Sequence, residues 1–522
     1  MFKGCEKLTK VGNISATTLA ASCYANMFKD CTALTTVGNI IAGDINVNPG
    51  YSTMFAGCTS LTTVGNISAT TLAASCYQGM FEGCNALRKV GNISVGDSNV
   101  NPGYSTMFNE CASLEIVGDI IAGDINEDPG YSTMFNRCIL LTTVGNIIAG
   151  DINVNPGYGT MFKDCTSLTT VGNISATKLY PSCYKYMFKG CTSLTTVGDI
   201  SAETLAESCC VNMFEGCTAL TTVGNISATT LASYCYAWMF KGCTELKQVT
   251  KKLPVETLAE SCYVNMFYEC KSLTQVPALP ATKLAPSCYY GMFAGCTGLV
   301  SEIDGDEEYN NLFKNLLPAE TLEESCYEAM FSECTSLQQA PALPATKLAT
   351  SCYEYMFSEC TSLTQAPELP ATTLATRCYA GMFEECTKLV SEIDGDEEYN
   401  NLFKNLLPAE TLASRCYSGM FSGCEKLTTT PELRATTLAE YCYENMFASY
   451  KDVNGNVLSS CIGLTQVPAL SATELKTSCY ESMFEGCISL TTVPELIATT
   501  LAASCYKNMF AGCTGLTKVG DI

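Results

Sequence analysis

The sequence predicts a repeat solenoid of about 19 stacked units, each 26 or 27 residues long. All 19 methionines are followed by phenylalanine, and these Met-Phe pairs recur at that period almost throughout the 522 residues. A cysteine and a leucine follow most pairs at a constant spacing. A residue type confined to one phase of a period has one structural role, which every unit repeats.

The period favours one continuous solenoid over residues 1–522 rather than several globular domains. Residues 1–250 hold units with a Val-Gly-Asn-Ile segment, and four of these units carry a Gly-Asp-Ile-Asn-Val-Asn-Pro-Gly-Tyr connection or a close copy of it. Residues 251–522 hold units of the Pro-x-Leu-Pro-Ala-Thr type. Three insertions interrupt this second part, near 299–318, 389–408 and 448–460.

Each unit is expected to contain short strands and one turn. Apolar and polar residues alternate around its Leu-Thr segment, which predicts one strand, and the Leu-Ala and Cys-Tyr positions suggest a second extended stretch. The spacings of three and four in Tyr-x-x-Met-Phe-x-x-Cys predict one helical or 3₁₀ turn, which the following Gly or Pro ends.

Stacking of neighbouring units would join their apolar positions into a continuous core, because one unit is too small to bury them alone. The predicted core includes Phe28, Cys31, Leu34, Phe188, Cys191, Leu194, Phe357, Cys360 and Leu363.

The repeat resembles the leucine-rich repeats of the BspA type, whose units carry an aromatic-Gly-Cys-x-x-Leu core. Here that core appears at 188–194 and 214–220, and the resemblance extends over essentially the whole chain. The resemblance implies a leucine-rich-repeat-like stack in an extracellular or cell-surface protein that acts in adhesion. Its implied partners are a host extracellular protein, a glycan or another cell surface. No catalytic residue comes with the family.

Composition narrows the choice of partners. The formal net charge is −23 and no basic cluster is present, so binding to nucleic acid or to an anionic membrane surface is not expected. No run of about 18 apolar residues predicts a membrane span. The sequence also shows no signal peptide. The chain begins and ends in phase with the repeat, which suggests end-to-end self-association into a filament as an alternative function. A phage tail or receptor-binding fibre is a further alternative, suggested only by the distribution of the family.

The first Asn-rich connection suggests a calcium site. Asp44, Asn46 and Asn48 alternate along the chain as the oxygen ligands of calcium loops do. However, Pro49 stands where such a loop needs glycine, and no glutamate occupies its twelfth position. An Asn-rich turn without metal is the other interpretation. Calcium is the only cofactor that the sequence suggests.

The three insertions are the best candidates for a specific contact, because insertions in solenoids form exposed loops. Residues 299–322 recur unchanged as residues 389–412, and each copy contains an acidic run. The third insertion has an Asn-Gly pair, which predicts a protruding hairpin. A solvated loop is the simpler interpretation of the acidic runs. The candidate binding residues are Glu302, Asp304, Asp306, Glu307, Asp394, Asp396, Asp452, Asn454 and Asn456.

The 34 cysteines are expected to be mostly free thiols in the core, with some bridges between neighbouring repeats as the alternative, because stacked cysteines would lie within disulfide reach. Most units carry two cysteines eight residues apart, but the four glycine-type units lose the first and keep the second, whereas an obligatory bridge would lose both. With no histidine in the chain, neither zinc binding nor a Cys-His or Ser-His-Asp site is expected, and the protein is predicted not to be an enzyme. The recurring Asn of the Asn-Ile-Ser segment suggests an asparagine ladder.

Overall fold

The computed structural model describes all residues except 19, 46–49, 73–76, 97–105, 109–110, 124–130, 152–156, 254, 452–453 and 520–522. The chain divides into two compact units, Met1–Pro254 (unit 1) and Val255–Ile522 (unit 2). This boundary falls close to the change of repeat type predicted at residue 250. Over the described residues, no helix combines the length and apolar character needed to cross a membrane.

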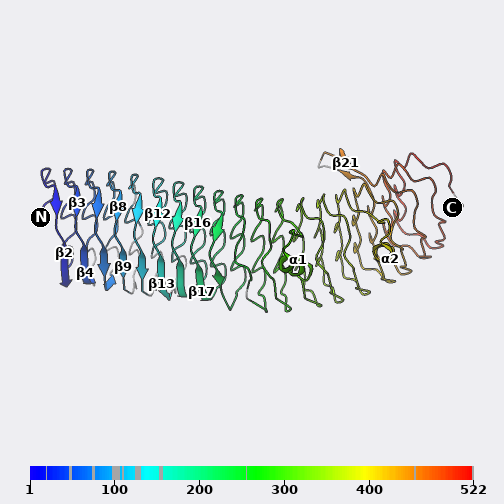
Figure 1. Cartoon of the computed structure of the whole chain (residues 1–522), viewed down its shortest axis with the longest axis horizontal. Helices are drawn as coiled ribbons and strands as arrows, with labels where there is room; N and C mark the ends of the chain where they lie inside the picture. Colours follow the sequence, from blue (N-terminus) through cyan, green and yellow to red (C-terminus); the bar gives the residue numbers. More distant parts are fainter. Residues whose placement is uncertain are drawn as a thin grey trace. The chain divides into compact units, whose positions relative to one another are not determined.

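Unit 1 is built around two parallel sheets whose strands come from successive repeats (Figure 1). The first sheet orders its strands as β1 (Lys10–Val11), β3 (Thr36–Val37), β5 (Thr63–Val64), β8 (Lys89–Val90), β10 (Ile116–Val117), β12 (Thr143–Val144), β14 (Thr170–Val171), β16 (Thr196–Val197) and β18 (Thr222–Val223). The second contains β2 (Ile14–Thr18), β4 (Ile40–Ile45), β6 (Ile67–Ala69), β9 (Ile93–Val95), β11 (Ile120–Ala122), β13 (Ile147–Asp151), β15 (Ile174–Lys178), β17 (Ile200–Thr204) and β19 (Ile226–Ser227), and β7 (Thr71–Leu72) also pairs with β4.

The register of both sheets follows the repeat. Val37 pairs with Val64, and Ile40 pairs with Ile67, so equivalent residues of successive repeats lie side by side. Because alternate strand residues face opposite sides, this register brings residues such as Val64 and Ile67 into the core, whereas Ile41 and Ile148, each one residue further along its strand, are exposed. The solenoid and its short stacked strands are therefore confirmed in unit 1.

A ladder of asparagines, each hydrogen-bonded to the equivalent residue of the next repeat, runs along unit 1 between the two sheets, as Asn39 does between β3 and β4. The Asn66 backbone N–H donates to Asn39 Oδ1 at 2.9 Å, and the Asn173 N–H donates to Asn146 Oδ1 at the same distance. The preceding glycines make room for it, because a Cβ at Gly65 would lie 2.4 Å from Asn39 Oδ1. Asp119 and Asp199 replace asparagine in two of the repeats and continue the ladder.

The segment around each Met-Phe pair departs from the prediction in one respect. It forms successive tight turns instead of a helical or 3₁₀ turn, and both helices among the described residues lie in insertions. The Met27 N–H donates to Tyr24 O at 3.1 Å, and Asn26 and Asp30 then have φ of 57° and 61°. These left-handed residues break each turn, so that the Phe28 N–H can donate to Met54 O of the next repeat at 2.9 Å.

The predicted core residues are all buried. Phe28 is 6 % exposed, and the other eight predicted residues are completely buried. Phenylalanine rings of successive repeats stack, as at Phe162 and Phe188, whose centroids are 5.2 Å apart in nearly parallel planes. The core of each unit is therefore a set of columns that run from repeat to repeat.

The described cysteines are free thiols, and all of them except Cys5 and Cys23 are buried. In one column the thiol donates to a phenylalanine carbonyl of the preceding repeat, as Cys58 does to Phe28 O at 3.1 Å. Burial raises the pKa of the Cys58 thiol to about 12, so it stays protonated at neutral pH.

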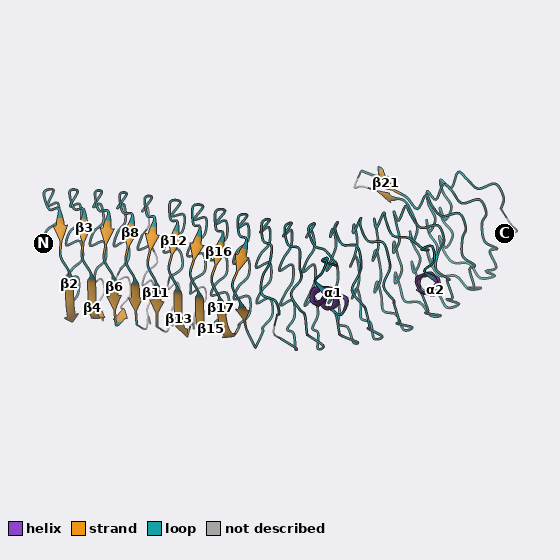
Figure 2. Cartoon of the chain, viewed as in Figure 1, coloured by secondary structure: helices purple, strands orange, loops and turns teal. Residues whose placement is uncertain are grey.

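Unit 2 keeps the columns but not the sheets (Figure 2). Its repeats are joined at isolated bridges such as Thr321 to Lys347 and Thr411 to Thr437. Proline now stands where unit 1 has the glycine before the ladder asparagine, and it cannot donate the backbone hydrogen bond that Gly65 gives to Val37 O. The prolines at this position are Pro277, Pro341, Pro367, Pro431, Pro468 and Pro494.

The insertions of unit 2 contain its regular elements. They are the helices α1 (Glu307–Lys314) and α2 (Glu397–Lys404), and the antiparallel pair β20 (Tyr450–Lys451) and β21 (Val457–Ser459). The hairpin predicted in the third insertion is confirmed. The first two insertions are not simple loops, because each folds into a short loop followed by a helix.

Candidate binding grooves

The two identical insertions fold in the same way because each carries its own helix-start signal. Asp306 precedes α1, and its Oδ1 accepts a hydrogen bond from the Tyr309 N–H at 3.0 Å. Asp396 does the same for α2 through the Tyr399 N–H at 2.9 Å. An aspartate at this position satisfies an otherwise unpaired helix donor and interacts favourably with the helix dipole.

Each helix is anchored to the repeats beneath it. The Tyr309 hydroxyl donates to Val300 O at 2.7 Å, and the buried Phe313 ring lies 6.2 Å from the core ring of Phe331. Asn310 exchanges two hydrogen bonds with the backbone of Ile303, which ties the loop to the helix. The second copy repeats these contacts through Tyr399, Phe403 and Asn400.

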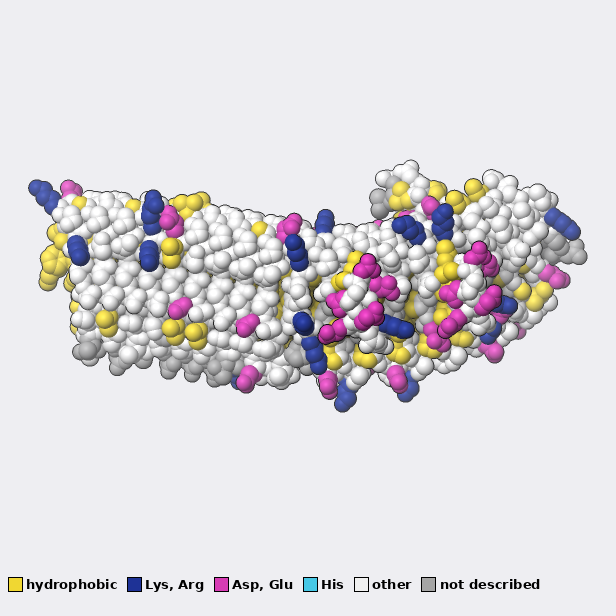
Figure 3. Space-filling model, in the orientation of Figure 1, with side chains coloured by type: hydrophobic (Ala, Val, Ile, Leu, Met, Phe, Trp, Pro, Cys, Tyr) yellow, Lys and Arg dark blue, Asp and Glu magenta, His cyan; other side chains and the backbone are white. Residues whose placement is uncertain are grey.

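A groove lies between each helix and the proline-containing segments of the following repeats. The groove beside α1 (groove 1) has a volume of about 550 Å³, and the groove beside α2 (groove 2) has about 770 Å³. Cavities of this size accommodate small ligands or a side chain of a larger partner. Acidic side chains gather over both helices on one face of unit 2, next to apolar patches (Figure 3).

The helix wall is the same in both grooves. Groove 1 is lined by Glu302, Glu307, Asn310, Asn311, Phe313 and Lys314. Groove 2 has the equivalent Glu392, Glu397, Asn400, Asn401, Phe403 and Lys404. Both walls therefore present two carboxylates, two amides and one ammonium group.

The opposite walls differ because the repeats beneath the two insertions differ. Groove 1 is lined there by Ala342 and Pro344, whereas groove 2 has Glu432 and Arg434 at the equivalent places. Lys404 Nζ lies 3.5 Å from Glu432 Oε1, and Arg434 binds Glu432 at 2.8 Å. Lys314 has no ion pair with any described residue, whereas Lys404 is paired with Glu432, and Glu368 places a carboxylate on the opposite wall of groove 1.

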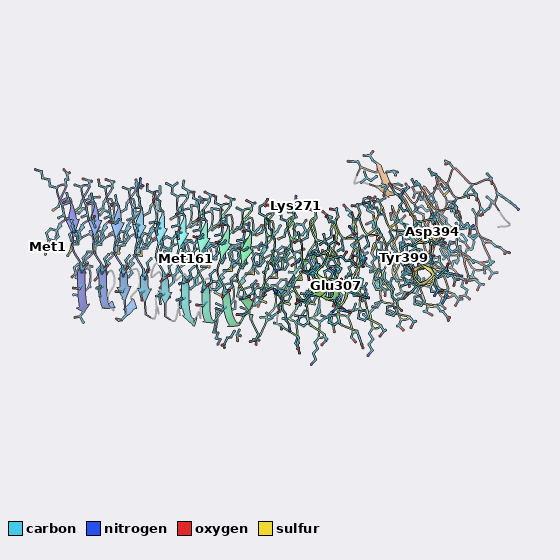
Figure 4. All side chains as sticks on the ribbon, viewed as in Figure 1. Met1, Met161, Lys271, Glu307, Asp394 and Tyr399 are labelled. Atoms are coloured by element: carbon cyan, nitrogen blue, oxygen red, sulfur yellow. The ribbon has the colours of Figure 1, made fainter. Side chains whose placement is uncertain are left out.

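The predicted residues of the first two insertions separate into three roles. Glu302 and Glu307 line groove 1. Asp306 and Asp396 are helix caps with a structural role. Asp304 and Asp394 are exposed on the loops and line neither groove (Figure 4 labels Glu307, Asp394 and Tyr399).

Sequence reasoning did not select the amides and lysines of the helices, such as Asn311 and Lys314. Residues 307–314 form an amphipathic helix with buried Tyr309 and Phe313, and that pattern could have identified its outward face. No sequence pattern indicated Glu432 or Arg434, since they come from a different repeat.

The hairpin of the third insertion packs against a cluster of carboxylates. The Tyr450 hydroxyl donates to Glu359 at 3.4 Å, and the Ser459 hydroxyl donates to Glu385. Burial, together with the charges of Glu359 and Glu385, raises the pKa of the Glu384 carboxyl to about 7. The hairpin is therefore held over acidic groups of earlier repeats.

The remaining predicted site residues give less information. Asn454 and Asn456 are exposed on the hairpin, while Asp452 lies outside the described residues. Asp44 belongs to β4, and Asn46 and Asn48 lie outside the described residues, so the calcium prediction stays a prediction. Among the residues that are described, no group of three acidic or cysteine side chains is arranged to hold a metal ion.

The repeat pattern matches a family model described as "BspA type Leucine rich repeat region (6 copies)" over residues 1–122, 158–300 and 309–406. The chain belongs to the BspA-type leucine-rich repeat family. The family assignment agrees with the columns of Phe, Cys and Leu on which the resemblance was based. A comparison with curated proteins found no significant match.

Solved structures of leucine-rich repeat proteins are similar to this chain. A leucine-rich repeat protein from Bacteroides ovatus is 15 % identical, covers 76 % of this chain and 82 % of its own, and has a TM-score of 0.27. A chain of a TLR13–ssRNA13 complex is 11 % identical; the match covers 97 % of this chain and 81 % of that one, with a TM-score of 0.24. A leucine-rich cell surface protein from Faecalibacterium prausnitzii is 14 % identical; the match covers 97 % of this chain and 86 % of that one, with a TM-score of 0.19. Such low scores carry no information about function.

Proposed function

We propose that this leucine-rich repeat protein is a non-enzymatic recognition protein of the cell surface or extracellular space, which adheres to a protein or glycan through grooves 1 and 2. The observation that carries the proposal is the duplicated groove. Two copies of one helix wall, each anchored by the same buried tyrosine and phenylalanine, provide two related binding positions in unit 2.

Duplication suits adhesion because a partner with repeated epitopes can occupy both grooves. Linking two weak contacts raises the overall affinity well beyond that of either contact alone. The groove walls offer carboxylates, amides and lysines, which are groups that recognise hydroxyls, amides and charges on proteins or sugars. The surface or extracellular location is inferred from the family resemblance.

Filling the grooves tests the proposal. Asn311 and Asn401 are exposed on the helices and line grooves 1 and 2, so Asn311→Trp and Asn401→Trp would fill them without disturbing the core. Binding of the purified protein to immobilised extracellular matrix proteins and to a glycan array would be measured for the wild type, both single variants and the double variant. We expect each single variant to weaken binding and the double variant to abolish it.

The matched control is a tryptophan on the same helices outside the grooves. Glu308 and Glu398 are exposed and line neither groove, so Glu308→Trp with Glu398→Trp should keep wild-type binding. The proposal fails if the wild type binds no matrix protein or glycan. It also fails if the groove-filling double variant binds as well as the control.

A further inference from the structure

The charges of groove 1 narrow the class of partner that fits it. Glu302 and Glu307 line the groove from the insertion, Glu368 lines it from the opposite wall, and Lys314 is the one cation among its lining residues. All four side chains are exposed, and none of the three carboxylates forms an ion pair with any described residue. Both walls therefore carry negative charge that a cationic ligand would complement.

The opposite wall of groove 1 is also poor in hydrogen-bond donors. Proline has no backbone N–H, and two successive repeats place prolines on this wall, namely Pro341, Pro344, Pro367 and Pro370. The Ala342 N–H already donates to Lys314 O at 2.9 Å, and the Gln339 N–H already donates to Ser301 Oγ at 3.1 Å. Such a wall suits a ligand that supplies the donors itself, as a guanidinium does with its several N–H groups and no acceptor.

Groove 2 contains an arginine of the chain itself at the equivalent place. Arg434 stands where groove 1 has Pro344. Its guanidinium donates to Glu432 Oε2 at 2.8 Å and to the side chain of Asn405, the residue that ends α2. Asn315, which ends α1 in the same way, is exposed. The duplicated site therefore accommodates a guanidinium in groove 2, and groove 1 has the acidic groups without one.

We infer that the partner is a protein and that groove 1 receives an arginine side chain from a basic, extended segment of it, an inference that rests on the proposed function. The guanidinium would pair with the carboxylates, and its methylene stem would pack on the proline rings. The side-chain amides of Asn311 and Gln339 line the same groove and would bind the neighbouring peptide groups. Groove 2 binds such a segment more weakly, because Arg434 already engages Glu432 there.

Peptides that differ only in charge test this inference. A fluorescein-labelled peptide of glycine and serine with two arginines would be titrated with the full chain while fluorescence anisotropy is followed. Versions with citrulline or glutamate in place of arginine would be titrated in parallel, and spermine would be added as a competitor. We expect the arginine peptide to bind about tenfold more tightly than the citrulline peptide and to lose affinity as salt rises. The glutamate peptide should not bind, and spermine should compete only weakly because it has no peptide groups.

A charge-matched control separates groove binding from general attraction to an acidic chain. Both sets of substitutions would be made together with Asn401→Trp, which fills groove 2. Glu307→Gln with Glu368→Gln removes two carboxylates that line groove 1 and should lower the affinity for the arginine peptide by about tenfold. Asp304→Asn with Glu308→Gln removes the same charge from exposed residues that line neither groove, and should leave the affinity within about twofold.

The chain's own arginine provides a test with the opposite sign. With groove 1 filled by Asn311→Trp, only groove 2 remains open to the peptide. Arg434→Ala would then free Glu432 from one of its two cations. We expect this change to raise the affinity for the arginine peptide by about two- to fivefold.

Four outcomes would overturn the inference. These are no binding of the arginine peptide at millimolar concentration, equal binding of the citrulline peptide or spermine, equal losses in the groove 1 pair and its control, and weaker binding after Arg434→Ala. If any of these occurs while the groove-filling double variant still abolishes binding to a matrix protein or glycan, the proposed function stands and only the arginine-bearing partner is rejected.

Discussion

Units 1 and 2 share their core columns but differ in how their backbones are joined. Unit 1 has two parallel sheets and an asparagine ladder, whereas unit 2 has isolated bridges and proline at the ladder position. Yet Phe188 of unit 1 and Phe357 of unit 2 are both completely buried. The stacked side chains therefore continue where the strands are lost, together with backbone hydrogen bonds between successive Met-Phe turns, such as that from the Phe331 N–H to Met356 O at 2.9 Å.

The asparagine ladder cannot form where proline replaces the glycine that precedes the ladder asparagine, for a steric and a chemical reason. The ladder requires glycine, because a Cβ at Gly172 would lie 2.6 Å from Asn146 Oδ1 and 2.9 Å from Asn146 N. Proline has no N–H to donate and would occupy the same space. A repeat with proline at this position therefore cannot extend the ladder, and among the described residues helices occur only in insertions of unit 2.

The strongest test of this comparison removes a core ring from each unit. Phe162→Ala and Phe357→Ala should each lower the free energy of unfolding by about 3–5 kcal/mol, because both rings are completely buried between neighbouring rings. Urea unfolding followed by circular dichroism would measure both. A loss below about 1 kcal/mol in unit 2 would show that its columns do not carry its stability.

The carboxylate cluster under the hairpin should make only unit 2 sensitive to pH near neutrality. The pKa of Glu384 is raised to about 7 from an ordinary value near 4.5, so the folded state holds this proton more tightly than the unfolded state does. The stabilisation is complete below the ordinary pKa and is lost as pH rises through about 7. Its size is up to about 3 kcal/mol.

Urea unfolding at pH 5 and pH 8 would measure this dependence, with Glu384→Gln as the comparison. The neutral amide should remove most of the difference between the two pH values. An equal pH dependence in the variant would assign the effect to other groups.

The glycine of the asparagine ladder should matter only in unit 1. Gly172→Ala should destabilise unit 1 by about 1–3 kcal/mol, because its Cβ would press on the Asn146 backbone. Pro367→Ala, at the equivalent place in unit 2, should change stability by less than about 1 kcal/mol. Thermal unfolding of both variants would test this, and equal losses would remove the steric basis of the comparison.

A smaller effect is expected from the ladder side chain itself. Asn146→Ala removes the acceptor for the Asn173 N–H, a hydrogen bond of 2.9 Å on an exposed edge. The expected loss is about 1 kcal/mol. If hydrogen exchange at the Asn173 amide does not become faster in this variant, the ladder bond does not contribute to local stability.

Much of the fold could be predicted from the sequence because one period governs it. The Phe, Cys and Leu columns, the short strands of unit 1 and the free core thiols all follow from residues that recur in phase. The turn around Met-Phe was predicted too loosely, since sequence spacing does not distinguish a helical turn from tight turns separated by left-handed residues such as Asn26.

The candidate sites could be predicted only in part. The acidic insertions identified the position of the grooves, and the Asn-Gly pair identified the hairpin. The sequence alone did not show that Asp306 is a helix cap, that Glu432 pairs with Lys404 and Arg434 in groove 2, or that the Tyr450 hydroxyl reaches Glu359. Each of these contacts joins different repeats or depends on a helix whose outward face had not been assigned.

The sequence by itself determined which side chains form the core, because a period of 26 or 27 residues aligns identical residues when repeats stack. Only the tertiary structure decided which polar groups meet across repeats. Those contacts depend on where an insertion lies over the neighbouring repeats, and on backbone turns that no single repeat specifies. The two grooves arise from such contacts.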